Sequence, residues 1–471
     1  MSGAIDMTSS QARALGLGAA ALALAAAPAG ACEWAPDKLR YEDRVAKQCQ
    51  GGADAPWPGQ IKAVELNGLP GAVVGFGGEA RGRYEYTRNP AFGAAGQDPH
   101  GVWLQRLSVF ADVRLGPHVR GFVQATSAIE AGRAEGPSPV DENKLFLSNG
   151  FVDLAAPLDA DARLTLRGGR QELQYGSGRL VDVREGPNVR RTFDAARVIG
   201  EAGGWRGDAF YARPRRSEQG VFDDGPDRTV DLWGLYLSGH IETPAATNLD
   251  LYYLGFKDDD GVFVQGAARE LRHSLGARLW GDGQGWDWNL ELVYQFGAFG
   301  RGDINAWTVA SDAGYRPDGW SWRPRFGLSF NVASGDKDAG DRNLETFNPL
   351  FPRGNYFSEA AVLGPRNFFN VKPSVSLSPL PDLQITVDVN AFWRLETTDG
   401  VYDPAGDVIR APNGSSERFV GSAASLSMTY ELAPNLEATA IYAHFEPGAF
   451  VSATGPSRDI DFLEVTFAYK F

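Results

Sequence analysis

Short segments with alternating apolar and polar positions recur along the chain from Val73 to its end. In residues 286–296 every second residue is apolar, and the residues between them are polar except Val293. Residues 383–395 repeat this pattern with Phe392 as the exception, and residues 463–471 repeat it at the carboxyl end. A period of two places one set of side chains on each face of a β-strand.

Alternation of this kind fits a soluble β-sandwich or a membrane β-barrel with a watery lumen. Three observations favour the barrel. The polar positions include full charges and amides, such as Asp287, Asn289 and Glu291. The runs have the length of about nine to eleven residues that a tilted strand needs to cross a bilayer, and aromatic residues lie near their ends. We therefore predict an all-β fold, a transmembrane antiparallel β-barrel.

The barrel is predicted to have about eighteen strands, an even number as in single-chain bacterial barrels. Eighteen strands enclose an aqueous lumen rather than a packed interior, and an even number places both termini on the periplasmic side. The predicted strands begin near Val73, Val102, Val119, Leu145, Arg163, Ala196, Trp205, Asp231, Asn248, Leu271, Trp286, Asp303, Arg323, Phe368, Leu383, Phe419, Leu436 and Asp461.

The connections between these strands tend to alternate in length. Short ones are predicted to be periplasmic turns, and long ones to be extracellular loops or loops folded into the lumen. The short connections are 157–162, 203–204, 281–285 and 379–382, and the long ones are 88–101, 133–144, 178–195, 213–230, 334–366 and 397–418.

The amino-terminal residues 1–31 are predicted to be a secretory signal peptide. An apolar run from Ala14 to Ala27 follows Arg13 and ends in small residues, and it is too short to cross a bilayer as a helix. Cleavage after Ala31 makes Cys32 the first mature residue. Cys32 is then either acylated or paired with Cys49, the only other cysteine.

A lipidation site would normally carry Leu at position 29, where this chain has Ala29, so we expect the disulfide between Cys32 and Cys49. The predicted division of the chain is a signal peptide (1–31), a periplasmic amino-terminal segment (32–72) and an outer-membrane β-barrel (73–471).

Composition excludes several other classes of protein. The 471 residues are 43% hydrophobic, too many for a disordered chain, and the 57 glycines show no collagen triplet. The net charge of −14, from 45 basic and 59 acidic residues, argues against a nucleic-acid partner. It also argues mildly against transport of anions, although exposed loops are expected to carry much of it.

Arginines are concentrated in residues 163–197. Arg163 and Arg167 alternate with leucines, and a lipid-facing arginine at mid-bilayer costs about 2–4 kcal/mol, so these arginines are assigned to the lumen. Guanidinium groups bind carboxylates in bidentate geometry, so such a cluster would select carboxylated solutes. The candidate pore-lining residues are Arg167, Arg170, Arg184, Arg190, Arg191 and Arg197.

An alternative interpretation stays open for these arginines, and both interpretations can hold at once. They can pair with nearby acids as a structural ladder inside the barrel. The acids of the same region are Asp161, Glu172, Asp182, Glu185 and Asp194.

Metal binding and catalysis have weak support. Asp336, Asp338 and Asp341 are calcium candidates because calcium takes oxygen ligands, but they match no EF-hand spacing, and solvated loops are the favoured interpretation. We expect no cofactor and no enzymatic activity. His273 and Ser274 are adjacent in a predicted strand, so they point to opposite faces and form no dyad.

Two stretches resemble a known family. Residues 169–180 (GRQELQYGSGRL) and 181–194 (VDVREGPNVRRTFD) resemble the alginate-export porin family of Gram-negative outer membranes. Leu39-Arg40-Tyr41-Glu42-Asp43 is similar to the family's amino-terminal Arg-Tyr-acidic segment, and the terminal Phe471 fits as well. The resemblance implies an eighteen-stranded monomeric barrel whose narrowed, electropositive lumen passes an anionic polyuronate outward.

The sequence therefore predicts an outer-membrane porin for an anionic polysaccharide or small anionic solutes. The expected partners are outer-membrane lipid, lipopolysaccharide, the anionic solute, and the barrel assembly machinery through Phe471. A surface adhesin or scaffold with a plugged barrel, and a general diffusion porin without a polysaccharide role, are the alternatives.

Overall fold

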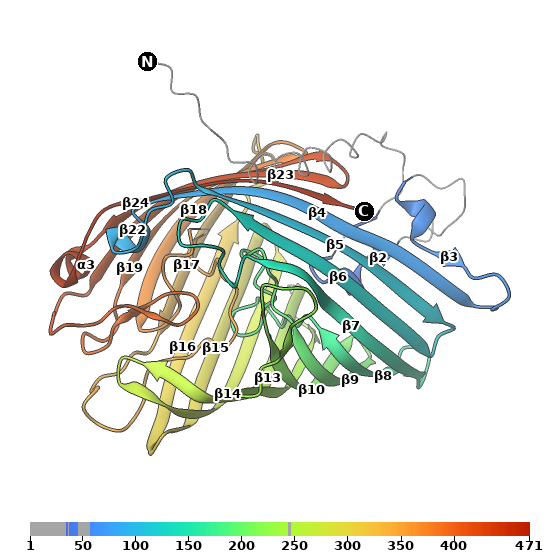
Figure 1. The fold of residues 1–471 in the computed structure, drawn as a ribbon, viewed down its shortest axis with the longest axis horizontal. Coiled ribbons are helices and arrows are strands. Elements are labelled where there is room, and N and C mark those ends of the chain that lie inside the picture. Colours follow the sequence, from blue (N-terminus) through green and yellow to red (C-terminus); the bar gives the residue numbers. More distant parts are fainter. Residues whose placement is uncertain (1–33, 36, 46–56, 244–245, 359) are drawn as a thin grey trace.

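Eighteen long strands form a closed antiparallel barrel in the computed structural model, which describes residues 34–35, 37–45, 57–243, 246–358 and 360–471. Consecutive long strands pair with one another, and β24 (Ile460–Lys470) closes the ring by pairing with β4 (Ala72–Arg88). Figure 1 shows this ring from the side. The barrel and the strand number predicted from the sequence are confirmed.

The strands begin close to the predicted positions, and the largest difference is at β14, which starts at Gly266 rather than Leu271. The other long strands are β5 (Val102–Leu115), β6 (Val119–Ala131), β7 (Asn143–Pro157), β8 (Arg163–Gln171), β9 (Phe193–Ala202), β10 (Trp205–Arg216), β12 (Val230–Ile241), β13 (Ala246–Phe263), β14 (Gly266–Gly283), β15 (Trp286–Phe299), β16 (Gly302–Tyr315), β17 (Arg325–Ala333), β18 (Phe368–Leu380), β19 (Leu383–Trp393), β22 (Phe419–Ala433) and β23 (Leu436–Pro447).

The remaining elements are short and lie in the connections or in the amino-terminal segment. They are β1 (Trp34–Ala35), β2 (Arg44–Val45), β3 (Val64–Glu65), β11 (Gly225–Pro226), β20 (Val401–Tyr402), β21 (Val408–Arg410), α2 (Pro90–Gly93), α3 (Ala449–Thr454) and the 3-10 turns η1 (Arg40–Glu42) and η3 (Gly59–Ile61). Within the described residues, every helix is too short or too polar to span a membrane.

Strand β15 shows how the alternating sequence becomes a two-faced wall. The side chain of Leu292 is 48% exposed on the outer face, while Glu291 is 3% and Val293 4% exposed. Val293 therefore breaks the polar pattern because it packs inside the barrel with the buried apolar cluster. Phe392 is a second such exception, since its ring meets Phe357 of a lumen loop at 5.3 Å.

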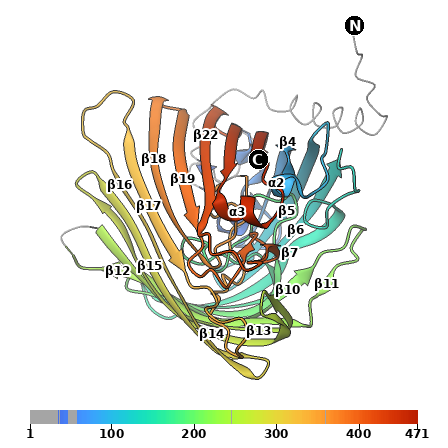
Figure 2. The same ribbon diagram turned by 90° about the vertical axis from the view of Figure 1, so that its left-hand side faces the viewer.

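The long loops gather at one end of the barrel, which we call the extracellular end because short turns of outer-membrane barrels face the periplasm. The turns at the opposite end include 158–162, 203–204, 284–285 and 381–382. Phe471 lies toward the turn end, where its backbone exchanges hydrogen bonds with Gly78. Seen from the loop end, loops occupy the space that the strands enclose (Figure 2).

The lumen contains more packed protein than the sequence predicted. The 172–192 loop and the 334–367 loop both fold inward and join through a parallel bridge between Val181 and Phe351. Leu173, Leu344 and Phe357 of these loops are buried with side chains from the strands. The expectation of an aqueous rather than packed interior is wrong for this part of the lumen, because apolar loop residues cover the inner wall.

The amino-terminal segment also departs from its prediction as a periplasmic segment. Tyr41 is 2% exposed and packs among Phe110, Phe122 and Phe151, three side chains on the inner faces of β5, β6 and β7. Part of segment 32–72 thus lies inside the barrel, because the Tyr41 ring packs against the apolar side chains of the inner wall. The predicted signal peptide, Cys32 and Cys49 lie outside the described residues.

Placing a charge on the outer face tests which side of the wall meets lipid. We expect Leu292→Arg to lower the free energy of unfolding by about 2–4 kcal/mol, because Leu292 lies near the middle of β15. Trp286→Arg, at the end of the same strand, should cost only about 0–1 kcal/mol. Equilibrium unfolding in lipid vesicles measures both, with Leu292→Met as control; equal costs at the two depths would contradict the orientation.

Candidate pore constriction

The 172–192 loop reaches into the lumen because the two strands that carry it are short. Strand β8 has 9 residues and β9 has 10, whereas β7 has 15. Gly176 and Gly178 turn the chain back with φ angles of 55° and 74°. A Cβ atom at Gly178 would lie 2.4 Å from Oδ2 of Asp182, so only glycine allows this close turn.

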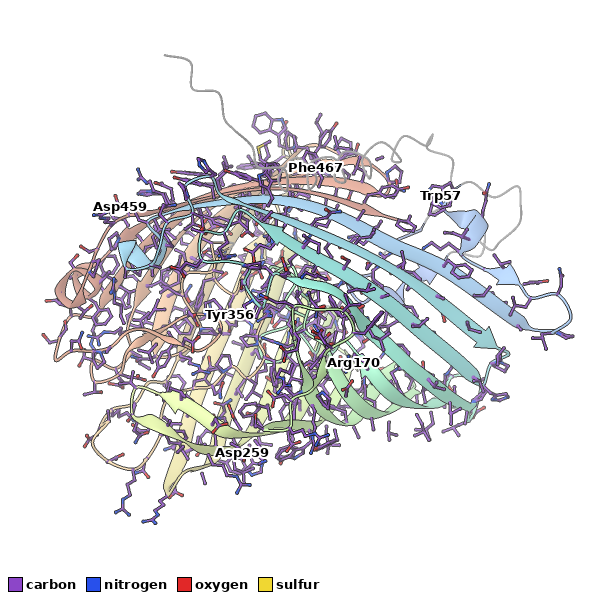
Figure 3. The ribbon with its side chains drawn as sticks, in the orientation of Figure 1. Trp57, Arg170, Asp259, Tyr356, Asp459 and Phe467 are labelled. Atoms are coloured by element: carbon purple, nitrogen blue, oxygen red, sulfur yellow. The ribbon has the colours of Figure 1, made fainter. Side chains whose placement is uncertain are left out.

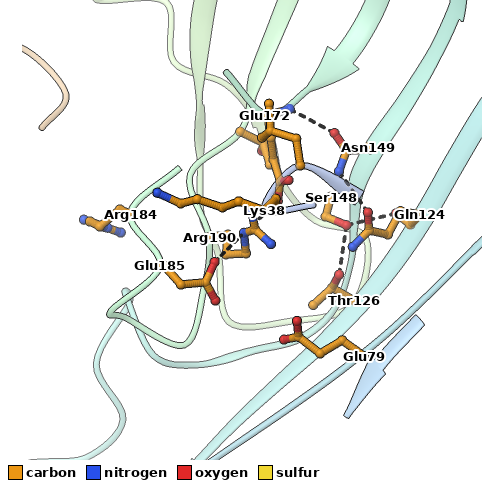
Figure 4. A network of polar contacts seen from close by, with 12 residues as sticks. Lys38, Glu79, Gln124, Thr126, Ser148, Asn149, Glu172, Arg184, Glu185 and Arg190 are labelled. Carbon is orange, nitrogen blue, oxygen red and sulfur yellow. Dashed lines mark hydrogen bonds and ion pairs between the residues drawn. The ribbon is translucent and has the colours of Figure 1, made fainter. Parts of the chain in front are cut away.

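Glu185 fixes the tip of the loop to the barrel wall. Its carboxylate pairs with Arg106 of β5, with Arg81 of β4 (Nη1–Oε1 3.6 Å) and with Arg190 of the same loop (Nε–Oε2 3.3 Å). Arg106 also binds Glu79 (Nη2–Oε1 2.8 Å). Figure 4 shows Glu185 beside Arg190, together with Glu79 of β4.

The first residue of the loop joins a second polar network. The backbone N–H of Glu172 donates to Oδ1 of Asn149 (2.9 Å), and Asn149 donates to Gln124 (3.1 Å). Ser148 donates to the backbone oxygen of Gln124 (3.1 Å). The Glu172 carboxylate pairs with Arg190 (Oε1–Nε 3.1 Å), so Arg190 links both networks (Figure 4).

The pKa values of the two loop carboxyls, Glu185 and Glu172, shift in opposite directions. Desolvation alone would raise the pKa of Glu185, but Arg106, Arg190 and Arg81 hold it well below its ordinary value. Burial raises the pKa of Glu172, because Arg190 only partly offsets the desolvation and the Glu185 charge adds to it. Glu185 is therefore the permanent anion of the constriction.

Arg167 and Arg197 lie on the lumen face, as predicted, but each has an acid partner. Arg167 binds Asp153 through two bonds (Nε–Oδ1 2.7 Å, Nη2–Oδ2 2.8 Å) and lies over the Phe151 ring. Arg197 pairs with Asp208. Arg167 and Arg197 therefore form ion pairs of the structural ladder that was the alternative interpretation. Arg190 is likewise paired with acids, Glu172 and Glu185.

Arg170 does not face the lumen, which corrects its assignment as a pore-lining residue. Strand β8 pairs with β7 and β9 without a register shift, so Arg170 and the lumen-facing Arg167 lie on opposite faces. Arg170, labelled in Figure 3, instead forms two hydrogen bonds with Asp194 of β9 (2.7 and 3.0 Å). Arg167 and Arg170 are three residues apart, and residues an odd number of positions apart on a regular strand point to opposite faces.

Arg184 and Arg191 are the two predicted arginines that lack an acid partner. Among the described residues no carboxylate lies within 4.0 Å of either guanidinium, and Nε of Arg184 has no hydrogen-bond partner. The guanidinium of Arg191 donates to the backbone oxygens of Asp182 (3.5 Å) and Pro352 (3.3 Å) and lies over the Phe351 ring. Both side chains are partly exposed.

The electrostatic environment of Arg191 reflects this lack of compensation. Desolvation lowers the pKa of its guanidinium well below the ordinary value, and the charge of Arg184 adds to the effect, opposed by Asp182. Arginine nonetheless stays protonated at physiological pH. The two cations therefore form an electropositive spot that a bound anion would stabilise.

Several lumen arginines were missed at the sequence level although their pattern was visible. Arg81 and Arg83 alternate with Ala80 and Gly82 in β4, which places them on the same face as Glu79. The contact between Arg106 and Glu185 had no such signal, because its partners are 79 residues apart.

The calcium candidates do not gather around one point. Oδ1 of Asp338 accepts from the backbone of Gly340 (3.0 Å), and Oδ1 of Asp341 accepts from that of Asn343 (2.7 Å), so both cap turns of their loop. Asp336 is buried and accepts from the backbone of Asp338. In the described part of the chain, no group of three or more His, Cys, Asp or Glu residues is arranged to hold a metal ion.

Comparison with known proteins decides the family. Residues 73–462 match the alginate export family. The chain belongs to this family. Its family and fold are those of porins, which are channels and not known enzymes, and barrels of this kind belong to the bacterial outer membrane. A search of the curated proteins found no match.

Solved porins of Pseudomonas aeruginosa share the fold at low sequence identity. OccD3 (OpdP) is 14% identical with a TM-score of 0.56, and the match covers 88% of this chain and 93% of that protein. OpdK with vanillate is 13% identical with a TM-score of 0.55 and coverages of 86% and 99%. OccK2 (OpdF) in complex with glucuronate is 11% identical with a TM-score of 0.54 and the same coverages.

Removing the charge of Glu185 should release the loop tip. In Glu185→Gln the three arginines lose their shared anion, and we expect hydrogen exchange in residues 172–192 to report a loss of about 1.5–3 kcal/mol in local opening free energy. Glu201→Gln, at an exposed and weakly paired glutamate, is the matched control with a loss of about 0–1 kcal/mol.

The depressed pKa of Glu185 also sets the pH range of this anchor. Because the pKa is lowered on folding, the stabilisation is complete above the ordinary glutamate value of about 4.3 and is lost only as the pH falls through the folded value. Wild-type protection of the loop should thus not fall between pH 7 and about pH 5, since the raised pKa of Glu172 acts in the opposite direction on acidification. A fall in protection within that range would contradict the assignment.

Proposed function

We propose that this porin passes anionic solutes, with a carboxylated polysaccharide of the alginate type as the leading candidate, through the space beside the 172–192 loop. One observation carries the proposal: Arg184 and Arg191 are positive and, among the described residues, have no acid within ion-pair distance, on a loop that narrows the lumen. Asp141 and Asp182 act on them only from farther away. The family supports a polyuronate, because alginate carries one carboxylate per sugar residue.

The distribution of charge explains why these two arginines matter more than the others. Arg167 and Arg197 are already neutralised by Asp153 and Asp208, so a passing anion would have to compete with a fixed acid. Arg184 and Arg191 offer guanidinium groups without that competition. Arginine binds carboxylates through two parallel hydrogen bonds, which suits a chain of uronate groups.

A polar cavity next to the loop gives a solute room. It has a volume of about 350 Å³. Its charged lining residues are Arg179, Arg325, Arg353, Lys372 and one acid, Asp312, and Asn and Ser side chains of β15 to β19 complete it. Amides and hydroxyls there can donate to and accept from sugar hydroxyls. Arg179 pairs with Glu291 and Lys372 with Asp388 at this wall, so its polar amides and hydroxyls are the groups open to a sugar chain, and we place the path along it.

The permeability of anions relative to cations tests the proposal. In planar bilayers at low salt, wild-type channels should favour anions, and Arg184→Gln and Arg191→Gln should each lower the anion-to-cation permeability ratio about fivefold, since a unit charge 4 Å away contributes about 1 kcal/mol in water. Uronate oligomers should block the wild type more strongly than either variant.

Arg170→Gln is the matched control, because it removes the same charge from the outer face and should leave selectivity unchanged. Cation selectivity in the wild type would contradict the proposal. A barrel that folds but never conducts would favour a scaffold that only displays its loops.

A further inference from the structure

Residues 37–43 run inside the barrel from the periplasmic side and end against the 172–192 loop. Tyr41 contacts Phe151 with ring centroids 5.2 Å apart and Phe122 at 6.0 Å, both edge to face. The guanidinium of Arg167 lies 4.7 Å from the centroid of the Tyr41 ring. This aromatic contact holds the segment against the wall formed by β6, β7 and β8.

Three polar contacts join this segment to the loop at separate points. The hydroxyl of Tyr41 donates to the backbone oxygen of Glu172 (2.6 Å), at the start of the loop. Nζ of Lys38 pairs with Oδ2 of Asp182 in its middle (2.6 Å), and Arg190 donates to the backbone oxygen of Lys38 near its end (2.6 Å). The segment thus ties the start, middle and end of the loop together.

The same segment is bound to the closing strands of the barrel. Arg40 donates to the backbone oxygens of Gly78 (3.2 Å) and Phe471 (3.5 Å) and pairs with Asp43 (3.3 Å). Arg120 donates to the backbone oxygen of Tyr41 (2.6 Å). The segment therefore connects the seam where the ring closes to the loop that narrows it.

We propose that residues 37–43 are a latch that holds the 172–192 loop in its narrow position, with Tyr41 and Lys38 as its positioning residues. When the latch withdraws toward the periplasm, the loop loses three contacts and the channel widens. This inference rests on the proposed function only in assuming that the barrel conducts, and it is independent of which ion the channel prefers.

The position of the latch suggests what displaces it. A cavity of about 520 Å³ lies at the periplasmic mouth. Its charged lining residues are Asp37 and Glu42 of the segment, and Arg114, Arg120, Arg163, Arg167, Arg206, Asp153 and Glu201 of the wall. A solute that enters from the periplasm meets this cavity before it reaches the loop. Arg120 binds Asp112 (Nε–Oδ1 2.7 Å) as well as the backbone oxygen of Tyr41, so Arg163 is the first cation that an anionic chain would meet. An anionic chain bound at Arg163 would place its charge beside Arg120, compete with the Tyr41 backbone for that guanidinium and favour the withdrawn state.

Two conservative variants of the full-length protein test the latch. Tyr41→Phe keeps the ring but removes the bond to Glu172, and Lys38→Met keeps the stem but removes the charge opposite Asp182. In single-channel recordings each should raise the ratio of wide to narrow conductance states about fivefold, the effect of losing one hydrogen bond. Tyr430→Phe on the outer face and Lys144→Met at an exposed position are the matched controls and should change nothing.

A charge exchange separates a latch from a general loss of structure. Lys38→Asp and Asp182→Lys should each widen the channel, and the double variant should return it toward the wild-type ratio, because the pair is restored with its signs reversed. Heat-modified migration on gels verifies that each barrel has folded. Folded single variants with wild-type conductance states would overturn the proposal.

The selectivity measurement keeps this result apart from the proposed function. If the latch variants change the wide-to-narrow ratio while anion preference is absent, the latch stands and the anion channel fails. If anion preference depends on Arg184 and Arg191 but the latch variants leave the conductance states unchanged, the latch is overturned and the anion channel stands.

Discussion

The hydrocarbon core of a membrane offers no water to an unpaired backbone group, and this constraint determines the rest of the structure. Every N–H and C=O of a crossing strand must find its partner within the protein, so the sheet has to close. The pairing of β24 with β4 supplies that closure. Because lipid covers the middle of the outer face, most charged side chains of the strands lie inside, and charge is concentrated in the lumen. The pair of Arg170 and Asp194 lies on the outer face at the ends of its strands.

Charge enclosed in the lumen has to be compensated, and many of the acidic residues serve this purpose. Arg167 pairs with Asp153, Arg197 with Asp208 and Arg106 with Glu79, so many acids neutralise arginines of the wall. A net charge of −14 is therefore compatible with a cationic constriction. What matters for a solute is the local balance around the loop, where two arginines remain without an acid.

The strands of the wall can be predicted well from the sequence, because side chains alternate between the two faces of a strand and this period of two is visible in neighbouring residues. The same rule places Arg167 inside and Arg170 outside, three residues later, once β8 is known to be regular. The loops follow no such rule. Glu185 meets Arg106 and Tyr41 meets Glu172 across long separations, so neither the packed lumen nor the latch was visible in the sequence.

This difference between wall and loop also determines where an arginine can remain without an acid partner. In an antiparallel wall each residue has a fixed opposite neighbour, as Arg167 has Asp153 on one side and Arg197 on the other. Like charges directly opposite are unfavourable, so wall arginines need acids close by. Loop residues have no cross-strand partner imposed on them, and Arg184 and Arg191 can stay uncompensated. The two arginines of the proposed selectivity therefore belong to a part of the molecule whose position depends on a few contacts. If they select the solute, the width of the channel is a property of conformation rather than of the barrel alone.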